Sequence, residues 1–525
     1  MKRGRLFPIA GLVLLVILLA GSNHAAASPA NWPMYRNNPL HTGVTADVVP
    51  PPLKLKWKQT FGDNVTGSPA VFGSRVYVGS DTLDKKLYAV DFATGNIIWS
   101  FDDAASLVPA TGWKSSPTIE TVGGQTVIFA GNDNGKLYAI RDDGATPFKL
   151  WEYASGGPVW SSPIVTTISG TQVVIFGNSA APGDLYALVA STGALFPGWA
   201  TNPFTEGGAA GAFISSPAIF GSSLFVGNSN GKVYAINLGN GALLWSDAPA
   251  GAVSIQSSPA VANVVIAGVP TDVVFIGAGD NKLRAYSAAS GGLPLWTFSA
   301  TAGSQINSSP AIVTIPSPPV ACAPGPTLAV IFGSEDDNVY AVRASDGTPC
   351  WTFPSNGPDN FDSSPSISGG TVYIGSDDNS FYAINLNSGV WLWSFPALAK
   401  VGDANTAPNA AISGSTVLFG TKAVAPGGGS LYAFEPLTVT ASTTQIVTVS
   451  TTTTTVSTGI TQTITNSTTL FTTLTSSTWI TTVVPPSSVP GFPVESILAG
   501  IIAGLAALGL LRQKHRRQEA RSSED

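Results

Sequence analysis

The chain has 525 residues, a formal net charge of −6 and only 11% charged residues beside 44% hydrophobic ones, with 56 Gly and 39 Pro. This composition is too apolar for intrinsic disorder and too interrupted by Gly and Pro for long helices. We therefore expect an all-β fold of short strands and tight turns. Because acidic residues outnumber basic ones in the body of the chain, nucleic acid is not expected as a partner.

Residues 1–27 have the pattern of a secretory signal peptide. Lys2, Arg3 and Arg5 precede an apolar run that extends to Ala20, and three alanines follow at 25–27. A basic start, a short apolar run and a small-residue exit are typical of a cleaved leader, the alternative being an uncleaved anchor. Residues 28–52 then form a lead-in segment.

Eight repeats follow over residues 53–437. Each opens with a Ser-Pro signature, whose proline lies at 69, 117, 163, 217, 259, 310, 365 and, in a degenerate copy, 408. A tryptophan closes each unit with a mean spacing of about 48 residues; these eight are Trp57, Trp99, Trp151, Trp199, Trp245, Trp296, Trp351 and Trp393. The spacing predicts an eight-bladed β-propeller of four-stranded antiparallel blades.

The position of Trp57 predicts how the ring closes. Trp57 precedes the first Ser-Pro signature, and no tryptophan unit follows Tyr432. We therefore expect residues 53–61 to supply the outer strand of the last blade, an N-terminal strand that closes the ring and removes its open edges.

The segment from Ala89 to Trp99 matches the pattern Ala-x-Asp-x-x-Thr-Gly-x-x-x-Trp. It resembles the tryptophan-docking repeat of pyrroloquinoline-quinone (PQQ) enzymes and of their non-catalytic relatives, such as the outer-membrane assembly lipoproteins. Looser copies end at Trp245, Trp351 and Trp393, and the run from Trp32 to Gly43 resembles the lead-in of the same family. The resemblance implies a quinoprotein-like propeller over about residues 32–436.

The resemblance to PQQ dehydrogenases would further imply an adjacent cysteine pair, a catalytic Asp, Glu and Asn ligands for Ca²⁺ and often a haem-binding Cys-x-x-Cys-His. The chain has no adjacent cysteines and no haem motif. His41 is the only histidine between the leader and the tail, and we interpret it as structural. The working hypothesis is a non-catalytic surface module that binds a protein or glycan partner, with no confident cofactor. The alternatives are a PQQ- and Ca²⁺-dependent dehydrogenase with an atypical active site, and a structural envelope protein.

A candidate ligand site lies where each Ser-Pro strand enters the central channel. The residue before each signature changes from blade to blade and is expected to line one mouth of the channel. These residues are Thr66, Lys114, Trp160, Ile214, Gln256, Asn307, Asp362 and Asn405. Trp160 and Trp113 are the aromatic residues on which a quinone would stack. The alternative is a set of ordinary loop residues with no common ligand.

Three further features concern covalent chemistry and turns. Cys322 and Cys350 are expected to lie on the same side of one blade and to form a disulfide, two free thiols being the alternative. Asn64, Asn307 and Asn466 head Asn-x-Ser/Thr triplets and are candidate glycosylation sites. Acidic clusters such as 335–338 and 377–379 lack the spacing of a calcium loop, so we interpret them as hairpin turns.

The C-terminal part predicts an anchor. Residues 438–490 are rich in Ser and Thr and suggest an extended stalk. Residues 491–517 hold an apolar run from 494 to 511, long enough for a transmembrane helix, and then a basic stop; residues 518–525 would form a cytoplasmic tail. Pro490-Gly491-Phe492, the span and the basic cluster resemble the C-terminal sorting signals of archaeal surface proteins, a plain membrane anchor being the alternative. We therefore expect an exported protein that is anchored to the membrane with its propeller outside the cell.

Overall fold

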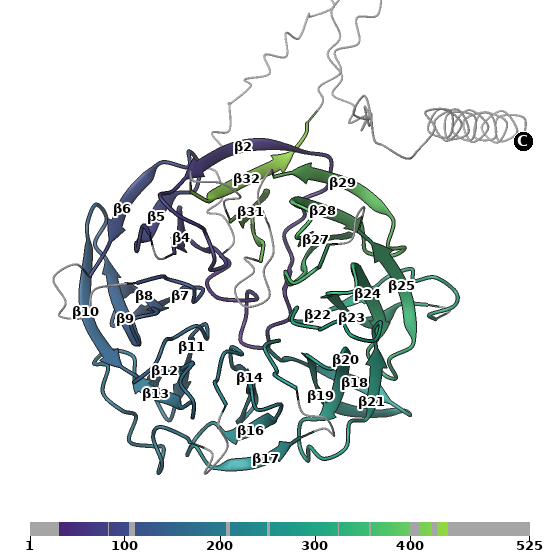
Figure 1. Ribbon diagram of the computed structural model, residues 1–525, viewed down its shortest axis with the longest axis horizontal. Coiled ribbons are helices and arrows are strands. Elements are labelled where there is room, and N and C mark those ends of the chain that lie inside the picture. The colour runs from purple at the N-terminus through teal and green to yellow at the C-terminus, as the bar shows by residue number, and fades with distance from the viewer. Residues whose placement is uncertain are drawn as a thin grey trace, which may run out of the picture. The chain divides into compact units, whose positions relative to one another are not determined.

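The computed structural model describes residues 31–438 except 82, 104–110, 206–210, 249–252, 324, 356–358, 398–408 and 423–427. Eight β-sheets surround a central channel, as Figure 1 shows. In each blade the chain runs from the channel to the rim, so neighbouring strands in sequence are also neighbours in the sheet. The predicted eight-bladed propeller is confirmed. In the described part of the chain, no helix is of a length and hydropathy that would cross a membrane. The predicted signal peptide, the predicted stalk after residue 438 and the predicted anchor lie outside the described residues.

The strands are short, as expected for propeller blades. The innermost strands are β3 (Ala70–Phe72), β7 (Thr118–Val122), β11 (Ile164–Ile168), β14 (Ala218–Phe220), β18 (Ala260–Ile266), β22 (Ala311–Ile315), β26 (Ser366–Ser368) and β30 (Ala411–Ser413). The second strands are β4 (Arg75–Gly79), β8 (Gln125–Gly131), β12 (Thr171–Gly177), β15 (Ser223–Gly227), β19 (Val269–Ala278), β23 (Thr327–Ser334), β27 (Thr371–Gly375) and β31 (Thr416–Gly420). The third strands are β5 (Leu87–Asp91), β9 (Lys136–Asp142), β13 (Leu185–Val189), β16 (Val233–Asn237), β20 (Lys282–Ser287), β24 (Asn338–Arg343), β28 (Ser380–Asn385) and β32 (Ser430–Pro436). The outer strands are β6 (Ile97–Phe101), β10 (Pro147–Ala154), β17 (Leu243–Asp247), β21 (Trp296–Ser299), β25 (Pro349–Pro354), β29 (Trp391–Pro396) and β2 (Leu53–Thr60).

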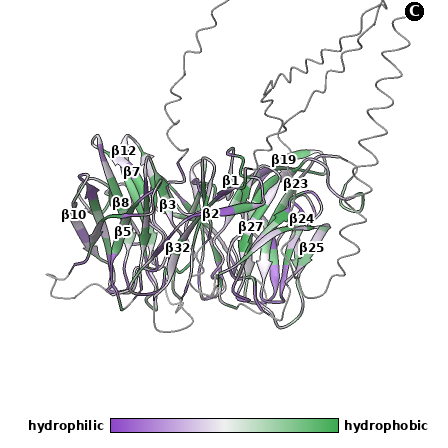
Figure 2. Cartoon of the chain, turned by 90° about the horizontal axis from the view of Figure 1, so that it is seen from above, coloured by the Kyte–Doolittle hydropathy of each residue, from purple (hydrophilic) through white to green (hydrophobic). Residues whose placement is uncertain are grey.

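The apolar runs become the second and third strands because both of their faces are covered by neighbouring blades. In β27 all five residues are buried, whereas the outer strand β25 alternates between buried and exposed positions. Figure 2 shows the apolar residues concentrated along the strands. The acidic clusters fall at the turns between second and third strands, where Asn281, Asp337 and Asn379 adopt positive φ angles. That conformation is the one that a tight hairpin turn requires, in agreement with their interpretation as turns.

The first and last parts of the propeller share one blade. Strand β2 pairs antiparallel with β32 from Leu53↔Pro436 to Thr60↔Ser430. The N-terminal strand is therefore the outer strand of blade 8, and the predicted closure is confirmed.

Blade 3 has three strands in its sheet, β11, β12 and β13. Its outer segment, which contains Pro197 and Trp199, touches β13 through two isolated bridges, Leu188↔Leu195 and Leu185↔Phe204. The side chain of Asn202 bonds to both the N–H and the C=O of Ala187. The edge of β13 is thus covered by a loop where the other blades have a fourth strand.

The repeated tryptophans dock each blade onto the next. Six of them donate their indole N–H to a backbone carbonyl of the following blade over 2.9–3.0 Å, at Phe92, Ala190, Leu238, Ala288, Ala344 and Leu386. The same indoles lie against the glycine of the following turn, which has positive φ, as Trp199 does against Gly241. A side chain at that glycine would collide with the ring, which explains the Thr-Gly in the repeat.

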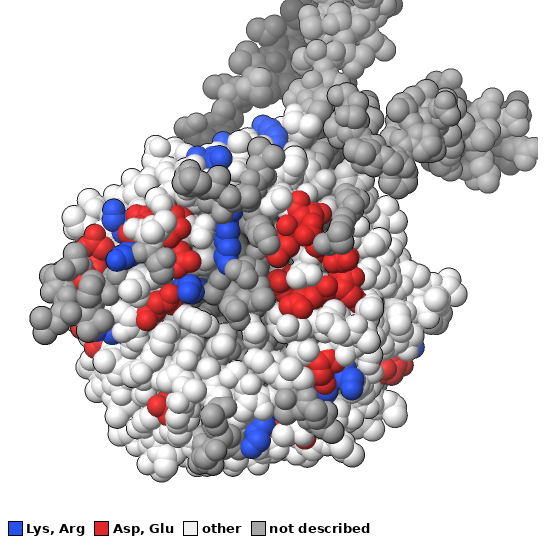
Figure 3. Space-filling model, viewed as in Figure 1, with Lys and Arg blue, Asp and Glu red and all other residues white. Residues whose placement is uncertain are grey.

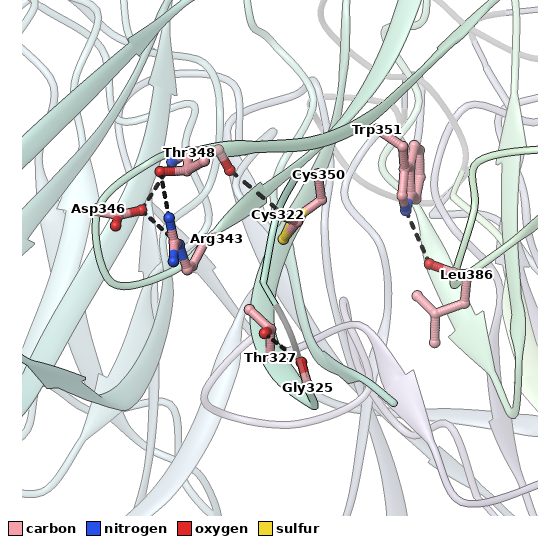
Figure 4. The surroundings of a disulfide bond; sticks show 9 residues. All are labelled: Cys322, Gly325, Thr327, Arg343, Asp346, Thr348, Cys350, Trp351 and Leu386. Atoms are coloured by element: carbon pink, nitrogen blue, oxygen red, sulfur yellow. Dashed lines mark hydrogen bonds and ion pairs between the residues drawn. A yellow bond between two sulfur atoms is a disulfide. The ribbon is translucent and has the colours of Figure 1, made fainter. Parts of the chain in front are cut away.

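Cys322 and Cys350 form the predicted disulfide. Cys322 lies in the loop between β22 and β23, and Cys350 lies in β25, so the bond joins two parts of blade 6 (Figure 4). Both cysteines belong to the apolar cluster that also contains Trp351.

Candidate functional site

A closed ring of hydrogen bonds surrounds the channel at the level of the Ser-Pro signatures. In each blade the backbone N–H at the second-serine position donates to the side-chain oxygen of its counterpart in the next blade, over 2.6–3.1 Å; this oxygen is an Oγ in seven of the bonds and Asn409 Oδ1 in the eighth. The members are Ser68, Ser116, Ser162, Ser216, Ser258, Ser309, Ser364 and Asn409. The signature repeats because every blade must supply both a donor and an acceptor to this ring.

This ring corrects the assignment of blade 8. The sequence frame put the eighth signature at Pro408, but Asn409 holds the place of the second serine and Ala410 that of the proline. The donor in the ring is the backbone N–H and the acceptor is a side-chain oxygen, so Asn409 Oδ1 can take the place of a serine Oγ although Asn does not match the signature. The mouth position of blade 8 is then residue 407, which, like Asn405, lies outside the described residues.

The lead-in segment crosses the channel beneath the serine ring and touches the blades in order. Carbonyls of Trp32, Pro33, Pro39, Leu40, Thr42 and Gly43 accept the N–H of the second residue after the proline in blades 1, 2, 4, 5, 6 and 7. Strand β1 (Val44–Thr45) then pairs parallel with β26, and Asp47 accepts the N–H of Gly414 in blade 8. Figure 1 shows this purple segment running through the centre of the ring. The lead-in therefore plugs the channel below the mouth.

Arg36 lies at the centre of the plug without an acidic partner. Its side chain is 1% exposed, and its two Nη atoms donate to the carbonyls of Pro310 and Pro365. These prolines lie between the lead-in and the serine ring, so the guanidinium extends from the plug toward the mouth. Burial lowers the pKa of Arg36 to about 10. The floor of the mouth thus contains a buried cation whose hydrogen-bond partners are neutral.

His41 is structural, as the sequence indicated. It is 2% exposed, and its Nδ1 lies 3.2 Å from the carbonyl of Pro259. Burial, reinforced by the charge of Arg36, lowers the pKa of His41 to about 3.

The lowered pKa of His41 predicts acid sensitivity. The folded state keeps His41 neutral, whereas the unfolded state takes up a proton below pH 6.5, so stability is full above pH 6.5 and falls as the pH drops toward 3. Urea unfolding should show a loss of about 2 kcal/mol between pH 6.5 and 5. The variant His41→Gln should lose much less over the same interval; an equal loss in both proteins would assign the effect to other groups.

The predicted mouth residues fall into two groups. Lys114 and Trp160 bind one another and a third residue: Lys114 Nζ lies 3.0 Å from Asp133 and 4.9 Å from the centre of the Trp160 ring, and the Trp160 indole donates to Asp133 over 2.6 Å. Asp362 is buried and Ile214 is half-buried. Sequence reasoning missed Asp133, which lies in a hairpin turn. Its position next to the mouth follows from the blade topology, because these turns and the mouth lie at the same end of the strands.

The second group has buried oxygens without hydrogen-bond partners among the described residues. These are Thr66 Oγ1, Gln256 Oε1 and Asn307 Oδ1, on three different blades. Thr66 is 1% exposed and Asn307 is 7% exposed, and the amide of Asn307 donates to Glu335 over 2.7 Å. Because buried acceptors are normally satisfied, these three oxygens indicate places for donors that the described part of the chain does not supply. The buried, bonded amide of Asn307 also disfavours glycosylation there; Asn64 is half-buried, and Asn466 lies outside the described residues.

The mouth face is acidic on one side of the channel. Glu335, Asp336 and Asp337 of blade 6 and Asp377 and Asp378 of blade 7 lie at its hairpin turns. Figure 3 shows acidic side chains on both sides of the centre. They are mixed with basic side chains on the left and have none among them on the right, in the position of these blades in Figure 1. Burial, together with the charge of Asp377, raises the pKa of Glu335. This half of the mouth therefore favours cations and hydrogen-bond donors over anions.

Trp113 does not line the mouth. It is fully buried, donates its indole N–H to Lys85 O and packs against Tyr138 with ring centres 5.1 Å apart. Its role is to fill the space between blades 1 and 2, so it cannot stack on a ligand without being displaced.

The geometry defines a class: an eight-bladed, tryptophan-docked propeller with a plugged channel. Comparison with known proteins agrees with this class. The family profile described as outer membrane protein assembly factor BamB matches residues 54–194, 149–313 and 279–456, and the chain belongs to this family of PQQ-type repeats.

Curated relatives are similar over part of their length. The chain is 28% identical over 185 residues to quinohemoprotein alcohol dehydrogenase ADH IIB of Pseudomonas putida, covering 32% of this chain and 26% of that protein. It is 25% identical over 248 residues to outer membrane protein assembly factor BamB of Shewanella oneidensis, covering 44% of this chain and 57% of the relative. The chain thus matches about a quarter and somewhat over half of the lengths of these relatives.

Solved structures share the fold. A europium-containing methanol dehydrogenase superposes with a TM-score of 0.58 at 14% identity, covering 77% of this chain and 98% of the other. The quinohemoprotein alcohol dehydrogenase of Comamonas testosteroni gives a TM-score of 0.57 at 15% identity, covering 80% and 82% of the two chains.

The described mouth residues do not fit PQQ with Ca²⁺. Lys114, the one cation among the eight predicted mouth positions, is paired with Asp133, and the opposite side is acidic, whereas PQQ carries carboxylates. The Arg36 guanidinium below the mouth is 1% exposed and bound to the carbonyls of Pro310 and Pro365. Among the described residues, no group of three His, Cys, Asp or Glu side chains is placed to hold a metal ion. The cysteines form a disulfide in blade 6 and are not adjacent in sequence. We derive no catalytic step through this cofactor.

Proposed function

We propose that the chain is a non-catalytic binding module, held at the outer surface of the cell, whose channel mouth accepts a donor-rich group of a partner. The observation that carries this proposal is the set of three buried oxygens, on Thr66, Gln256 and Asn307, that have no hydrogen-bond partner among the described residues. Hydroxyl or amine groups entering the mouth would donate to these oxygens, and the acidic side of the mouth would attract such groups.

The sequence supports the proposed location. The leader-like residues 1–27 favour export, and the apolar run from 494 to 511, with the basic residues after it, favours an anchor. The Ser/Thr-rich stalk would hold the propeller away from the membrane without adding chemistry.

A calorimetric titration separates this proposal from a quinone-dependent dehydrogenase. PQQ, with and without Ca²⁺, is titrated into a fragment of residues 30–437. We expect no saturable heat at concentrations of about 10⁻⁴ M, well above the Kd of a specific cofactor site. Saturable binding that weakens in Trp160→Ala or Asp362→Ala would overturn the non-catalytic assignment.

Site-directed crosslinking tests the mouth itself. Because both native cysteines are in the disulfide, a single new cysteine can carry a photoreactive label. Gln256→Cys places the label at the mouth, and Ser222→Cys places it in an exposed turn at the opposite end of the strands. The proposal expects a discrete adduct in cells from the first variant alone. The same adduct from both variants, or from neither, contradicts it.

A further inference from the structure

One of the blade junctions departs from the docking rule. Trp99, at the junction of blades 1 and 2, donates its indole N–H to the side chain of Asp142 over 3.1 Å. Six other docking tryptophans use a backbone carbonyl at the equivalent position, where the residues are Phe, Ala or Leu. In six other blades the residue three positions after that carbonyl is a glycine that lies against the indole. In blade 2 this position is Ala145, and Gly144, one residue earlier, has no atom within 4 Å of a Cβ built on it.

The departure leaves a pocket of about 310 Å³ between the two blades. Phe72, Ser74, Arg75 and Tyr77 of blade 1 and Thr126 and Asp142 of blade 2 line it. The pocket is formed by the turn between the first and second strands of blade 1 and by the turn between the third and fourth strands of blade 2. Because both turns lie at the end of the blades opposite the channel mouth, the pocket opens at that end. Its volume lies within the range of small-molecule sites.

The polar wall of the pocket is fixed in place. Asp142 Oδ1 accepts from Arg75, Trp99 and the N–H of Gly144, and Oδ2 accepts from the hydroxyl of Tyr77 over 2.6 Å. The Asp142 side chain is only 5% exposed, and Arg75 is held by its Nη1. Among the described residues, Arg75 Nε and Nη2 have no protein acceptor, and Asp142 Oδ2 can accept a second hydrogen bond.

These groups select a ligand by chemistry. Arg75 and Asp142 neutralise one another, as do Arg141 and Asp143 beside them, so the pocket has no net charge to attract an ion. Arg75 Nε and Nη2 form a fixed donor edge next to the acceptor Asp142 Oδ2. This pair matches two neighbouring hydroxyl groups, of which one accepts a hydrogen bond from Arg75 and the other donates one to Asp142. Phe72 supplies an apolar surface for C–H groups, and Ser74 and Thr126 supply further hydroxyls.

We infer that this pocket binds one neutral hexose unit through a vicinal diol held between Arg75 and Asp142. The site is separate from the channel mouth, so its failure would leave the proposed function untouched. The interaction is weak because the pocket is small and open, and dissociation constants of about 1 mM are expected for a single sugar.

The test uses saturation-transfer NMR on the full chain with the methyl α-pyranosides of glucose, mannose and galactose as probes, each at about 20 mM. Ser74→Trp fills the pocket without altering the contacts of Asp142. The matched control is Ser222→Trp, because the blade 4 turn Ala-Ile-Phe-Gly-Ser at residues 218–222 differs in one residue from the blade 1 turn Ala-Val-Phe-Gly-Ser at residues 70–74. Arg75→Ser installs the residue that blade 4 has at the next position, Ser223.

At least one glycoside should give saturation transfer from the parent protein. Its affinity should fall by tenfold or more in Ser74→Trp and in Arg75→Ser, and should be unchanged in Ser222→Trp. A thermal unfolding midpoint shared by Ser74→Trp and Ser222→Trp shows that the fold is kept. Absence of transfer from all three glycosides would overturn the inference, and so would binding that is unchanged in Ser74→Trp.

Discussion

A chain that starts at residue 61 should lose its cooperative unfolding transition. This deletion removes β2, which forms the outer edge of blade 8, together with the lead-in that bonds to the inner strands of six blades and to Gly414 of blade 8. It leaves β32 as an open edge and several buried N–H groups on the channel wall without acceptors, each costing about 1–3 kcal/mol. Because the sum exceeds the stability of an ordinary domain, we expect a partly folded, aggregating product in circular dichroism and calorimetry.

The control for this deletion is a chain that ends at residue 437, which keeps the whole ring and should melt like the full chain. The single substitution Trp57→Ala removes the docking contact between blade 8 and Gly95 of blade 1 but leaves β2 and the lead-in segment in the chain. It should cost about 3–5 kcal/mol while the transition stays cooperative. If the chain starting at residue 61 melted within a few degrees of the parent, closure by the N-terminal strand would not be the main support of the ring.

Gly241→Ala should destabilise the propeller far more than Gly221→Ala, although both are single methyl additions in blade 4. Gly241 has φ +72, and its Cβ would lie 2.7 Å from Cδ2 of Trp199. Gly221 has φ +58, and a Cβ built there meets nothing within 4 Å. Both variants strain a left-handed backbone by about 1–2 kcal/mol, but the first must also displace a docked indole, an overpacking cost of about 1–3 kcal/mol more.

Urea unfolding of the two glycine variants measures the difference directly, since the left-handed strain is common to both. A difference below about 0.5 kcal/mol would mean that the indole moves freely. That result would contradict the docking role assigned to the Thr-Gly and Trp positions of the repeat.

The fold could be predicted from the sequence because the short strands and tight turns within each unit and the eightfold repeat of that unit indicate the same structure. The Ser-Pro signature and the closing tryptophan recur in one frame, and a ring of equivalent blades satisfies all eight copies at once. Trp57 precedes the first signature, and no tryptophan unit follows Tyr432. These two observations were sufficient to predict the closing strand, and the pairing of Leu53 with Pro436 confirms it. The disulfide was predictable for the same reason, since the blade topology fixes where two loops lie.

The site was less predictable because its contacts join residues far apart in sequence. Nothing in a linear pattern says that Asn409 can take the place of a serine, or that Arg36 would be buried between Pro310 and Pro365. The residue at the mouth position changes from blade to blade, but whether Lys114 is available to a ligand depends on Asp133, which the turn brings to it. Asp142 was overlooked because it stands at a single position where six other blades have Phe, Ala or Leu. Only the structure shows that its carboxylate replaces a backbone carbonyl as the acceptor of the Trp99 indole N–H.

The shared blade has a consequence for the order of events during synthesis. β2 is among the first segments of the chain to leave the ribosome, yet its partner β32 ends at Pro436. The lead-in likewise bonds to strands in blades that are made hundreds of residues later. No intermediate of translation can therefore contain the native ring, and β2 must stay without its partner strand until β32 has been made. A nascent chain stopped before residue 430 leaves β2 unpaired, so any factor that covers exposed β-strands has its longest opportunity to act on this strand.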